Sequence, residues 1–291
     1  MLSEKTRAYI SISFVNVLWG LSFIASKLAL ENGFQPFSLA FVRFALASVI
    51  LAPIYFKKKG DFALPRADFF KIFMSAVLGI TLYFLFEYKG LQNTSASTAS
   101  LIIASIPALT LFVGRALRHR KYPAICYMGS VLSLVGVYII VRYSSGEGSD
   151  TLIGNIYIIC ACFCWVGFIE LADGLMRKHT SLYVTFWQTV IATVTLIPCA
   201  MTEPIDWAAV APIGWIMAVY LSVLCSVVAY LLYNQTIKVL EPFKAALFIN
   251  INPLSAVIGG VLLLGETMMP MQILGGAIVL ISIFIVNRRS V

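Results

Sequence analysis

Apolar residues gather in ten long runs along the chain, separated by short polar segments. The runs cover residues 8–30, 36–56, 69–91, 95–115, 122–142, 152–175, 181–201, 212–234, 242–264 and 270–287. A helix needs about 20 apolar residues to cross a bilayer, and runs this long are typical of helices rather than of alternating barrel strands. The pattern predicts an all-α integral membrane protein with ten transmembrane helices, because helices satisfy their own backbone groups in lipid.

Helix-start residues stand at several predicted boundaries. Pro36 opens the second run, Ser95 the fourth and Pro242 the ninth, and Asp150 lies just before the sixth. Side chains of Ser and Asp accept hydrogen bonds from the first free backbone amides of a helix, and proline fits its first turn. We therefore expect helices to begin at these positions.

Basic residues occur mainly between alternate pairs of runs. If the N-terminus is cytoplasmic, that side carries seventeen Lys and Arg residues, whereas the opposite side carries only Lys89 and Arg142. Cytoplasmic loops are enriched in Lys and Arg, so both termini are predicted to be cytoplasmic. Because 60% of the residues are apolar, 12% are charged and the basic residues form short loop clusters, the net charge of +8 does not indicate a nucleic-acid partner.

The chain resembles itself at an interval of 146 residues. Among the identical residues that this shift pairs are Trp19 with Trp165, Ala99 with Ala245, Leu101 with Leu247, Pro107 with Pro253, Gly114 with Gly260 and Gly129 with Gly275. The pattern predicts two related repeats, residues 1–145 and 146–291. Five spans per repeat is an odd number, so the second repeat is expected to have inverted topology, with the substrate site between the two near the middle of the bilayer.

A set of short motifs follows a characteristic order. Trp19-Gly20 lies in the first run and Arg43-Phe44 in the second, residues 88–97 read YKGLQNTSAS, and Leu264-Gly265-Glu266 ends the ninth. Together with the ten runs and the duplication, these motifs resemble the EamA family of the drug/metabolite transporter superfamily over essentially the whole chain. The resemblance implies an inner-membrane carrier, in many members an exporter of amino acids or other metabolites. One departure is His119-Arg120-Lys121, which stands where the other repeat has Gly265-Glu266-Thr267.

Charged residues inside predicted spans are costly and therefore mark candidate functional sites. Glu87 is a candidate for proton coupling or for recognition of a cationic group, with an ion pair to Lys27 as the structural alternative. Arg43 lies about 10 Å deep at 1.5 Å per residue, and either fixes helix packing or contacts substrate. Glu170 lies nearer the cytoplasmic end, where a gating role or a structural pair with Arg177 is expected.

Other candidates are polar or aromatic residues in the spans. Asn16 and Trp19 share a helix face, as do Tyr83 and Glu87. The predicted substrate-binding set is Asn16, Trp19, Tyr83, Glu87, Trp165, Tyr233, Asn250 and Asn252. Pro107 and Pro253 occupy matched positions, where each frees a carbonyl and interrupts a helix, and paired interruptions point to a transporter site. Kinked packing and volume filling are the alternative explanations.

The sequence offers no reaction centre. Cys160, Cys162 and Cys164 are spaced so that only the first and last share a helix face, and no His is near them, so packing is favoured over metal binding. No nucleotide-binding or hydrolase motif occurs in a fitting context, so neither an enzyme nor a cofactor is expected.

The resulting hypothesis is a secondary transporter of a small metabolite, such as an amino acid or amine, in the cytoplasmic membrane. It would work by alternating access as an exporter, with protons as a candidate coupling ion, and as a monomer or homodimer in the lipid bilayer. The alternative is a non-transporting membrane receptor or structural subunit. Polar residues at mid-membrane depth favour the transporter.

Overall fold

The computed structural model describes residues 3–57, 66–119, 122–143, 151–240 and 242–289, and it includes no side-chain description for Arg118, Asn250 and residues 283–289. The described residues contain helices and turns, with no strand among them. The all-helical prediction is therefore confirmed for this part of the chain.

The helices fall into two series of matching order. The first series is α1 (Glu4–Glu31), α2 (Pro36–Lys57), α3 (Arg66–Ala76), the π-helical η1 (Val77–Leu82), α4 (Tyr83–Leu91), α5 (Ala96–Ile103), α6 (Ile106–Arg118) and α7 (Ala124–Arg142). The second is α8 (Leu152–Met176), α9 (Ser181–Ala200), α10 (Pro212–Tyr220), the π-helical η2 (Leu221–Val228), α11 (Ala229–Val239), α12 (Pro242–Leu247), the 3₁₀ turn η3 (Phe248–Asn250), α13 (Ile251–Leu264) and α14 (Pro270–Arg289).

Nine helical segments in the described residues are long and apolar enough to cross a membrane. They coincide with the first nine predicted runs to within a few residues at each end. α14 has 20 residues of helical backbone, and its apolar part with described side chains is Pro270–Ser282. Ten spans therefore stay a prediction.

Capping residues explain where several helices begin. Ser95 and Thr180 have extended backbones and accept hydrogen bonds from the amides of Thr98 and Tyr183. Pro36 and Pro242 are the first residues of α2 and α12. Thr151 caps α8, whereas Asp150 lies outside the described residues. Local sequence chemistry therefore fixes these boundaries.

Irregular backbone recurs at matched places in the two series. The π-helical turns η1 and η2 interrupt corresponding helices, and a second interruption falls between α5 and α6 in one series and at η3 in the other. His119 and Gly265, 146 residues apart, both have left-handed backbones, with φ of 52° and 64°. Such agreement in backbone detail fits a duplicated unit.

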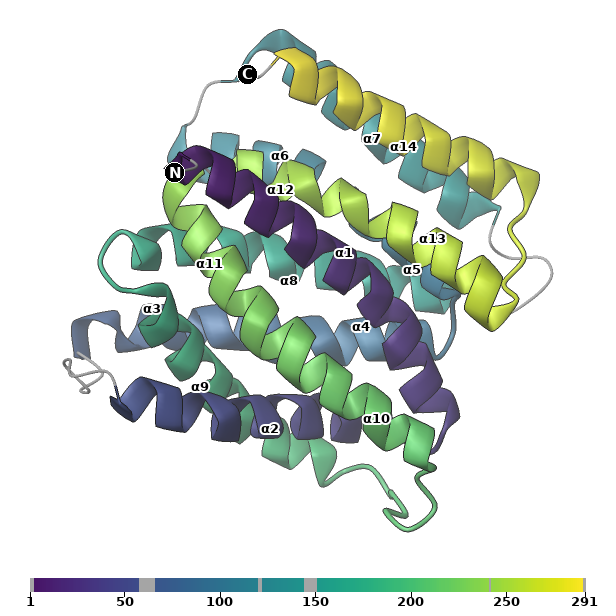
Figure 1. The fold of residues 1–291 in the computed structure, drawn as a ribbon. Helices are drawn as coiled ribbons and strands as arrows, with labels where there is room; N and C mark the ends of the chain where they lie inside the picture. Colours follow the sequence, from purple (N-terminus) through teal and green to yellow (C-terminus); the bar gives the residue numbers. More distant parts are fainter. Residues whose placement is uncertain (1–2, 58–65, 120–121, 144–150, 241, 290–291) are drawn as a thin grey trace.

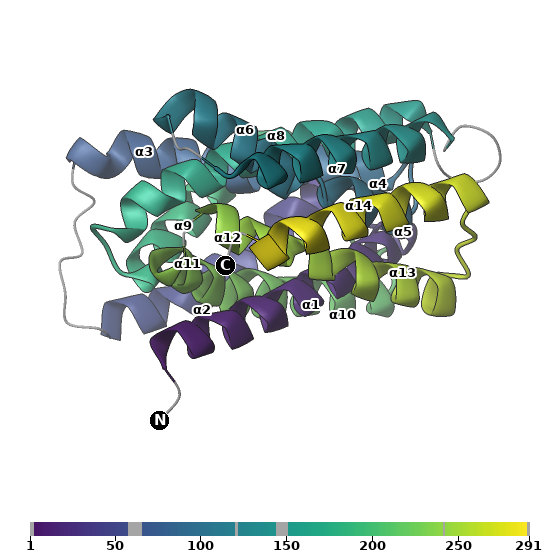
Figure 2. The same cartoon turned by 90° about the horizontal axis from the view of Figure 1, so that it is seen from above.

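The first helix of each series packs against helices of the other series, and the two sets of contacts correspond. α1 packs on α11 and α13, and α8 packs on α4 and α6. α2 pairs with α9, and α7 pairs with α14 at one edge of the bundle (Figure 1). In both views α1 begins and α14 ends toward the same end of the bundle (Figures 1 and 2).

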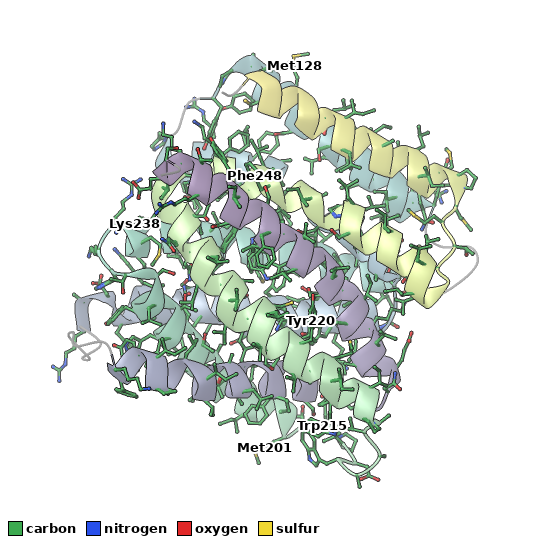
Figure 3. All side chains as sticks on the ribbon, viewed as in Figure 1. Met128, Met201, Trp215, Tyr220, Lys238 and Phe248 are labelled. Atoms are coloured by element: carbon green, nitrogen blue, oxygen red, sulfur yellow. The ribbon has the colours of Figure 1, made fainter. Side chains whose placement is uncertain are left out.

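The outer surface is rich in apolar side chains. Met128 and Met201 project outward with exposed fractions of 68% and 81% (Figure 3). Large exposed apolar side chains occur on most helices, from Ile10 on α1 to Ile281 on α14. Lipid is the solvent that such a surface fits, because soluble monomers rarely expose contiguous apolar area on this scale.

Candidate functional site

A cluster of aromatic rings forms where α1, α4, α8 and α11 meet. The rings of Trp19 and Trp165 meet edge to face with centroids 5.2 Å apart. Tyr83 approaches Trp165 at 4.9 Å, and Tyr230 approaches Trp19 at 5.7 Å. The indole N–H of Trp19 donates to the backbone oxygen of Cys225 at 3.0 Å, which fixes this ring against η2.

Glycines allow the helices to approach one another around this cluster. A Cβ on Gly20 would lie 2.5 Å from the backbone oxygen of Asn252, so α1 can contact α13 only without a side chain there. A Cβ on Gly79 would collide with the ring of Phe168, three residues after Trp165. Both glycines lie close to site residues, so the close helix packing that they allow helps to position the aromatic cluster.

A small pocket lies among these rings. It is lined by Trp19, Ser22, Phe23, Arg43, Tyr83, Phe84, Glu87, Ile103, Ile106, Trp165, Tyr230, Ile249 and Asn252. The cavity volume is about 20 Å³, enough for roughly one water molecule. The structure therefore represents a state in which the rings nearly fill the site.

Most of the lining is shared between the two helix series. At the 146-residue interval, four pairs line the pocket together: Trp19 with Trp165, Phe84 with Tyr230, Ile103 with Ile249 and Ile106 with Asn252. The five remaining lining residues all come from the first series: Ser22, Phe23, Arg43, Tyr83 and Glu87. The pocket therefore combines a paired, mostly apolar frame with five residues from the first series, among which are its acid and its base.

Glu87 is the acid in this pocket lining. Its side chain is 2% exposed, and its Oε1 accepts no hydrogen bond from the described residues. The Tyr83 hydroxyl, one turn earlier on α4, interacts with the carboxylate. Buried polar atoms almost always have partners, so an unpartnered oxygen at a pocket indicates a place for water, a proton or a ligand.

The predicted alternative partner of Glu87 lies elsewhere. Lys27 is 3.7 Å from Glu266 Oε1 and donates to the backbone oxygen of Thr94 at 3.1 Å. The expectation of a Glu87–Lys27 pair is therefore wrong. The end of α1 brings Lys27 beside the connection between α13 and α14, a contact between segments far apart in sequence.

Arg43 is fully buried and firmly held. Its Nε donates to Ser226 Oγ at 2.7 Å, and its Nη1 donates to the Tyr88 hydroxyl at 2.8 Å. The guanidinium also lies 4.3 Å from the ring centroid of Phe84, within cation–π range. These contacts join α2, α4 and η2, as the predicted packing role of Arg43 requires, while one side of the residue faces the pocket.

The helix interruptions lie beside the pocket. Pro107 is in the first turn of α6, directly after the break at Ala104 and Ser105, and Pro253 is in the first turn of α13. Pocket residues flank both breaks, as the pairs above show. A helix interruption from each series therefore lies next to residues that line the candidate site.

Other predicted residues lie nearby without lining this pocket in the described residues. Asn16 is buried one turn before Trp19 and donates to the backbone oxygen of Ile12 at 2.6 Å. Tyr233 packs on Trp19 with ring centroids 4.8 Å apart and forms a layer behind the pocket. The side chain of Asn250 lies outside the described residues.

Glu170 is buried on α8, away from the pocket lining. Of the two predicted roles, gating or a pair with Arg177, the described part of the structure does not show the pair. The Arg177 guanidinium lies 3.3 Å from Asp173, one turn earlier on α8. The sequence prediction missed Tyr230 and Phe84 in the pocket. Their 146-residue relation was the signal that could have identified them, although the pair is not identical.

Polar contacts also link the two helix series near both ends of the bundle. At one end, Glu266 accepts from the backbone amides of Ala96 and Ser97 and from Ser97 Oγ at 2.6–3.0 Å, which ties the α13–α14 connection to the start of α5. At the other end, Asp68 of α3 contacts Lys178 at 3.0 Å and His179 at 2.9 Å. Both clusters join the two helix series across the bundle.

No group of three or more metal-ligating residues in the described part of the chain is arranged to hold a metal ion. Cys162 and Cys164 are buried on α8, and Cys160 is partly buried. Besides its aromatic and aliphatic residues, the pocket lining contains the Glu87 carboxylate, the Arg43 guanidinium, the Asn252 amide and the Ser22 hydroxyl.

Comparison with known proteins extends these observations. The model of the EamA-like transporter family matches the chain twice, at residues 6–142 and 152–288. An uncharacterized transporter of Archaeoglobus fulgidus is 27% identical over 98% of this chain and 99% of its own length. A WAT1-related protein of Arabidopsis thaliana is 24% identical over 97% of this chain and 90% of its own length.

A solved crystal structure has a similar fold. It matches 99% of this chain and 98% of its own chain, with a TM-score of 0.73 and 15% sequence identity. At this identity the likeness concerns the fold alone, and it extends over the whole helical bundle.

Proposed function

This chain belongs to the EamA-like transporter family, and we propose that it is a secondary transporter that moves a small solute across a membrane by alternating access. The observation that carries the proposal is the pocket between the two helix series, with a buried carboxylate oxygen that has no partner among the described residues. An unsatisfied buried polar group costs about 1–3 kcal/mol, and at a pocket a ligand or a proton would offset this cost.

The proposal includes the architecture predicted from the sequence. We propose ten spans, two repeats of opposite orientation, cytoplasmic termini and location in the inner membrane. The matched π-helical turns, the exchanged packing partners and the one-sided distribution of basic residues support this arrangement. In such a transporter the site stays fixed while the repeats rock about it.

The two end clusters support a state closed on both sides. Glu266 ties one end and Asp68 the other, and the cavity between them holds roughly one water molecule. A solute larger than water then requires the rings to separate and one end to open. Each end cluster is a contact that one of the open states would break.

The proposal extends to coupling and direction. Glu87 is placed to take up and release a proton as the pocket changes exposure, and export is the proposed direction. A carboxylate in a closed, apolar pocket is an effective proton-exchange group because its charged form is poorly solvated there.

Flux into proteoliposomes tests the function. Purified protein is reconstituted, and uptake of radiolabelled amino acids and amines is measured with solute gradients and with imposed proton gradients of either sign. We expect at least one solute to show protein-dependent, saturable flux that Glu87→Gln uncouples from the proton gradient. Glu31→Gln, an exposed acid on α1, is the matched control and should retain coupling. Absence of protein-dependent flux for every solute under every gradient contradicts the transporter proposal.

A further inference from the structure

We propose that the pocket recognises organic ammonium compounds, in which a positively charged amine is joined to an apolar body, in preference to zwitterions and anions. This inference rests on the proposed function, because it names the substrate class of the same site. The juxtaposition that carries it is an unpartnered buried carboxylate oxygen inside a ring-lined pocket whose one base is already engaged.

Aromatic rings surround the cavity. Trp19, Tyr83, Trp165 and Tyr230 line it from four different helices, and neighbouring centroids in this group are 4.9–6.0 Å apart. The face of an aromatic ring attracts a cation within about 6 Å of its centroid. A group in this cavity is bordered by several of these rings at once.

Glu87 supplies the negative charge. Its Oε1 accepts no hydrogen bond from the described residues, and no Lys, Arg or His among them lies within ion-pair distance of it. The groups that interact with it are the Tyr83 hydroxyl and, at longer range, Arg43. An ammonium N–H would give this oxygen the donor that the protein does not provide.

Arg43 does not offer a free carboxylate site. A guanidinium binds a carboxylate most strongly through two nitrogens of one edge. Nε, from one edge, donates to Ser226, and Nη1, from the other, donates to Tyr88. The ring of Phe84 covers one face of the same group. An acidic or zwitterionic ligand could therefore bind Arg43 through two nitrogens of one edge only by displacing one of these contacts.

The size of the cavity agrees with this assignment. A volume of about 20 Å³ accepts a group of roughly the size of a water molecule, such as an ammonium head group. The apolar body would enter when the rings separate. The two isoleucines on either side of the α5–α6 break, Ile103 and Ile106, offer it an apolar wall.

Four probes that share a phenyl ring test the inference on full-length protein in lipid nanodiscs. They are 2-phenylethylamine, phenylalanine, 3-phenylpropanoate and 2-phenylethanol, which carry a cation, a zwitterion, an anion and a neutral group. Binding is measured by calorimetry and by shift of the melting temperature. We expect the amine to bind at least roughly tenfold more tightly than each of the others, equivalent to about 1.4 kcal/mol.

Variants identify the groups responsible. Glu87→Gln should weaken amine binding at least roughly tenfold and leave 2-phenylethanol unchanged, whereas Glu31→Gln should change neither. Trp165→Leu should weaken amine binding, and Trp207→Leu, outside the pocket, should not. If Glu87→Gln fails to fold, the comparison of Trp165→Leu with Trp207→Leu still tests the contribution of the aromatic lining. Equal or tighter binding of phenylalanine, of the acid or of the alcohol would overturn the assignment, as would unchanged amine binding in Glu87→Gln.

Flux separates this inference from the proposed function. Saturable transport of a solute that 2-phenylethylamine does not inhibit would leave the transporter standing and refute the cation assignment. Amine binding that depends on Glu87, without protein-dependent flux of the amine under any gradient, would uphold the site and contradict transport.

Discussion

At the scale of single residues, the pocket contains two buried ionisable side chains, Arg43 and Glu87, that differ in the number of hydrogen-bond partners. Arg43 has two hydrogen-bond acceptors and an aromatic face, whereas Glu87 has an oxygen without a partner among the described residues. Burying a charge is expensive unless it is paired and hydrogen-bonded. The contacts of Arg43 therefore offset the free-energy cost of burying it. The cost of burying Glu87 is not fully offset, and a role in function would explain why it is buried.

This difference predicts opposite effects on stability. Arg43→Gln should lower the melting temperature of the purified protein by roughly 5 °C or more, because it leaves Ser226 and Tyr88 without their donor. Glu87→Gln should leave the melting temperature unchanged or raise it while coupling is lost, because a neutral amide is cheaper to bury. Thermal unfolding in one detergent compares the two. A large loss of stability in Glu87→Gln would indicate that this acid is structural.

At the scale of helices, close approach depends on glycine where two backbones meet. A Cβ on Gly136 of α7 would lie 2.7 Å from the backbone oxygen of Gly275 on α14, and a Cβ on Gly275 would lie equally close to the oxygen of Gly136. Small residues at such crossings allow helices to pack in lipid, where no hydrophobic force holds them together. The α7–α14 pair contributes no lining residue to the pocket in the described part of the chain.

Gly136→Ala should therefore separate α7 from α14 and lower the melting temperature, while ligand affinity per folded molecule is kept. The matched control is Gly174→Ala on α8, where a Cβ would meet nothing within 4 Å. That change should be neutral or raise stability by up to roughly 1 kcal/mol, because alanine favours a helix over glycine. Thermal unfolding of both variants, with amine affinity measured in parallel, tests this. Equal melting temperatures would contradict the predicted crossing.

The end clusters predict which side of the pocket opens when each is removed. A reporter thiol is introduced as Ser22→Cys in the pocket lining, in a background without the six native cysteines. Glu266→Ala should raise its labelling by a membrane-impermeant reagent, by roughly tenfold, only from the end where α13 joins α14. Asp68→Ala should raise labelling only from the opposite end. Equal labelling from both ends in either variant would contradict the role of that cluster.

At the scale of the whole molecule, the pocket lies between the two helix series, and helices of each series pack against helices of the other. The shared lining supplies a symmetric frame, and the five lining residues without counterparts all belong to the first series. If the two halves rock relative to each other, the lining residues contributed by both halves move apart or together. The polar residues contributed by one half keep their positions relative to one another. Most polar lining residues therefore come from the first series, and Tyr230 and Asn252 come from the second.

The proposed orientation predicts that both termini lie on the same side of the membrane. Short epitope tags at residues 1 and 291 should both be protected from protease in intact cells and both be cleaved in inside-out vesicles. The physical reason is the excess of Lys and Arg in loops on one side of the bundle. A tag accessible in intact cells at one end alone would require an odd number of spans and contradict the ten-span arrangement.

What the sequence determined by itself was mostly local. The predicted runs agree with the helices to within a few residues, because the length of an apolar segment and the chemistry of its first turn depend on neighbours in the chain. The depth of a residue in the membrane also follows from its position along its own span. The residues that could be proposed for the site on this basis, and that the structure brings to one pocket, are Trp19, Tyr83, Glu87, Trp165 and Asn252. The family resemblance, confirmed by the family match, rests on the same local motifs.

Only the tertiary structure decided which distant groups meet. It placed Lys27 beside Glu266 instead of Glu87, joined Arg43 to Tyr88 and Ser226, and added Tyr230 to the pocket. Such contacts depend on how each helix is rotated about its axis and which helices it packs against. Those choices come from the fit between surfaces far apart in sequence, and hydrophobic patterns leave them open because lipid and protein interiors accept the same apolar side chains.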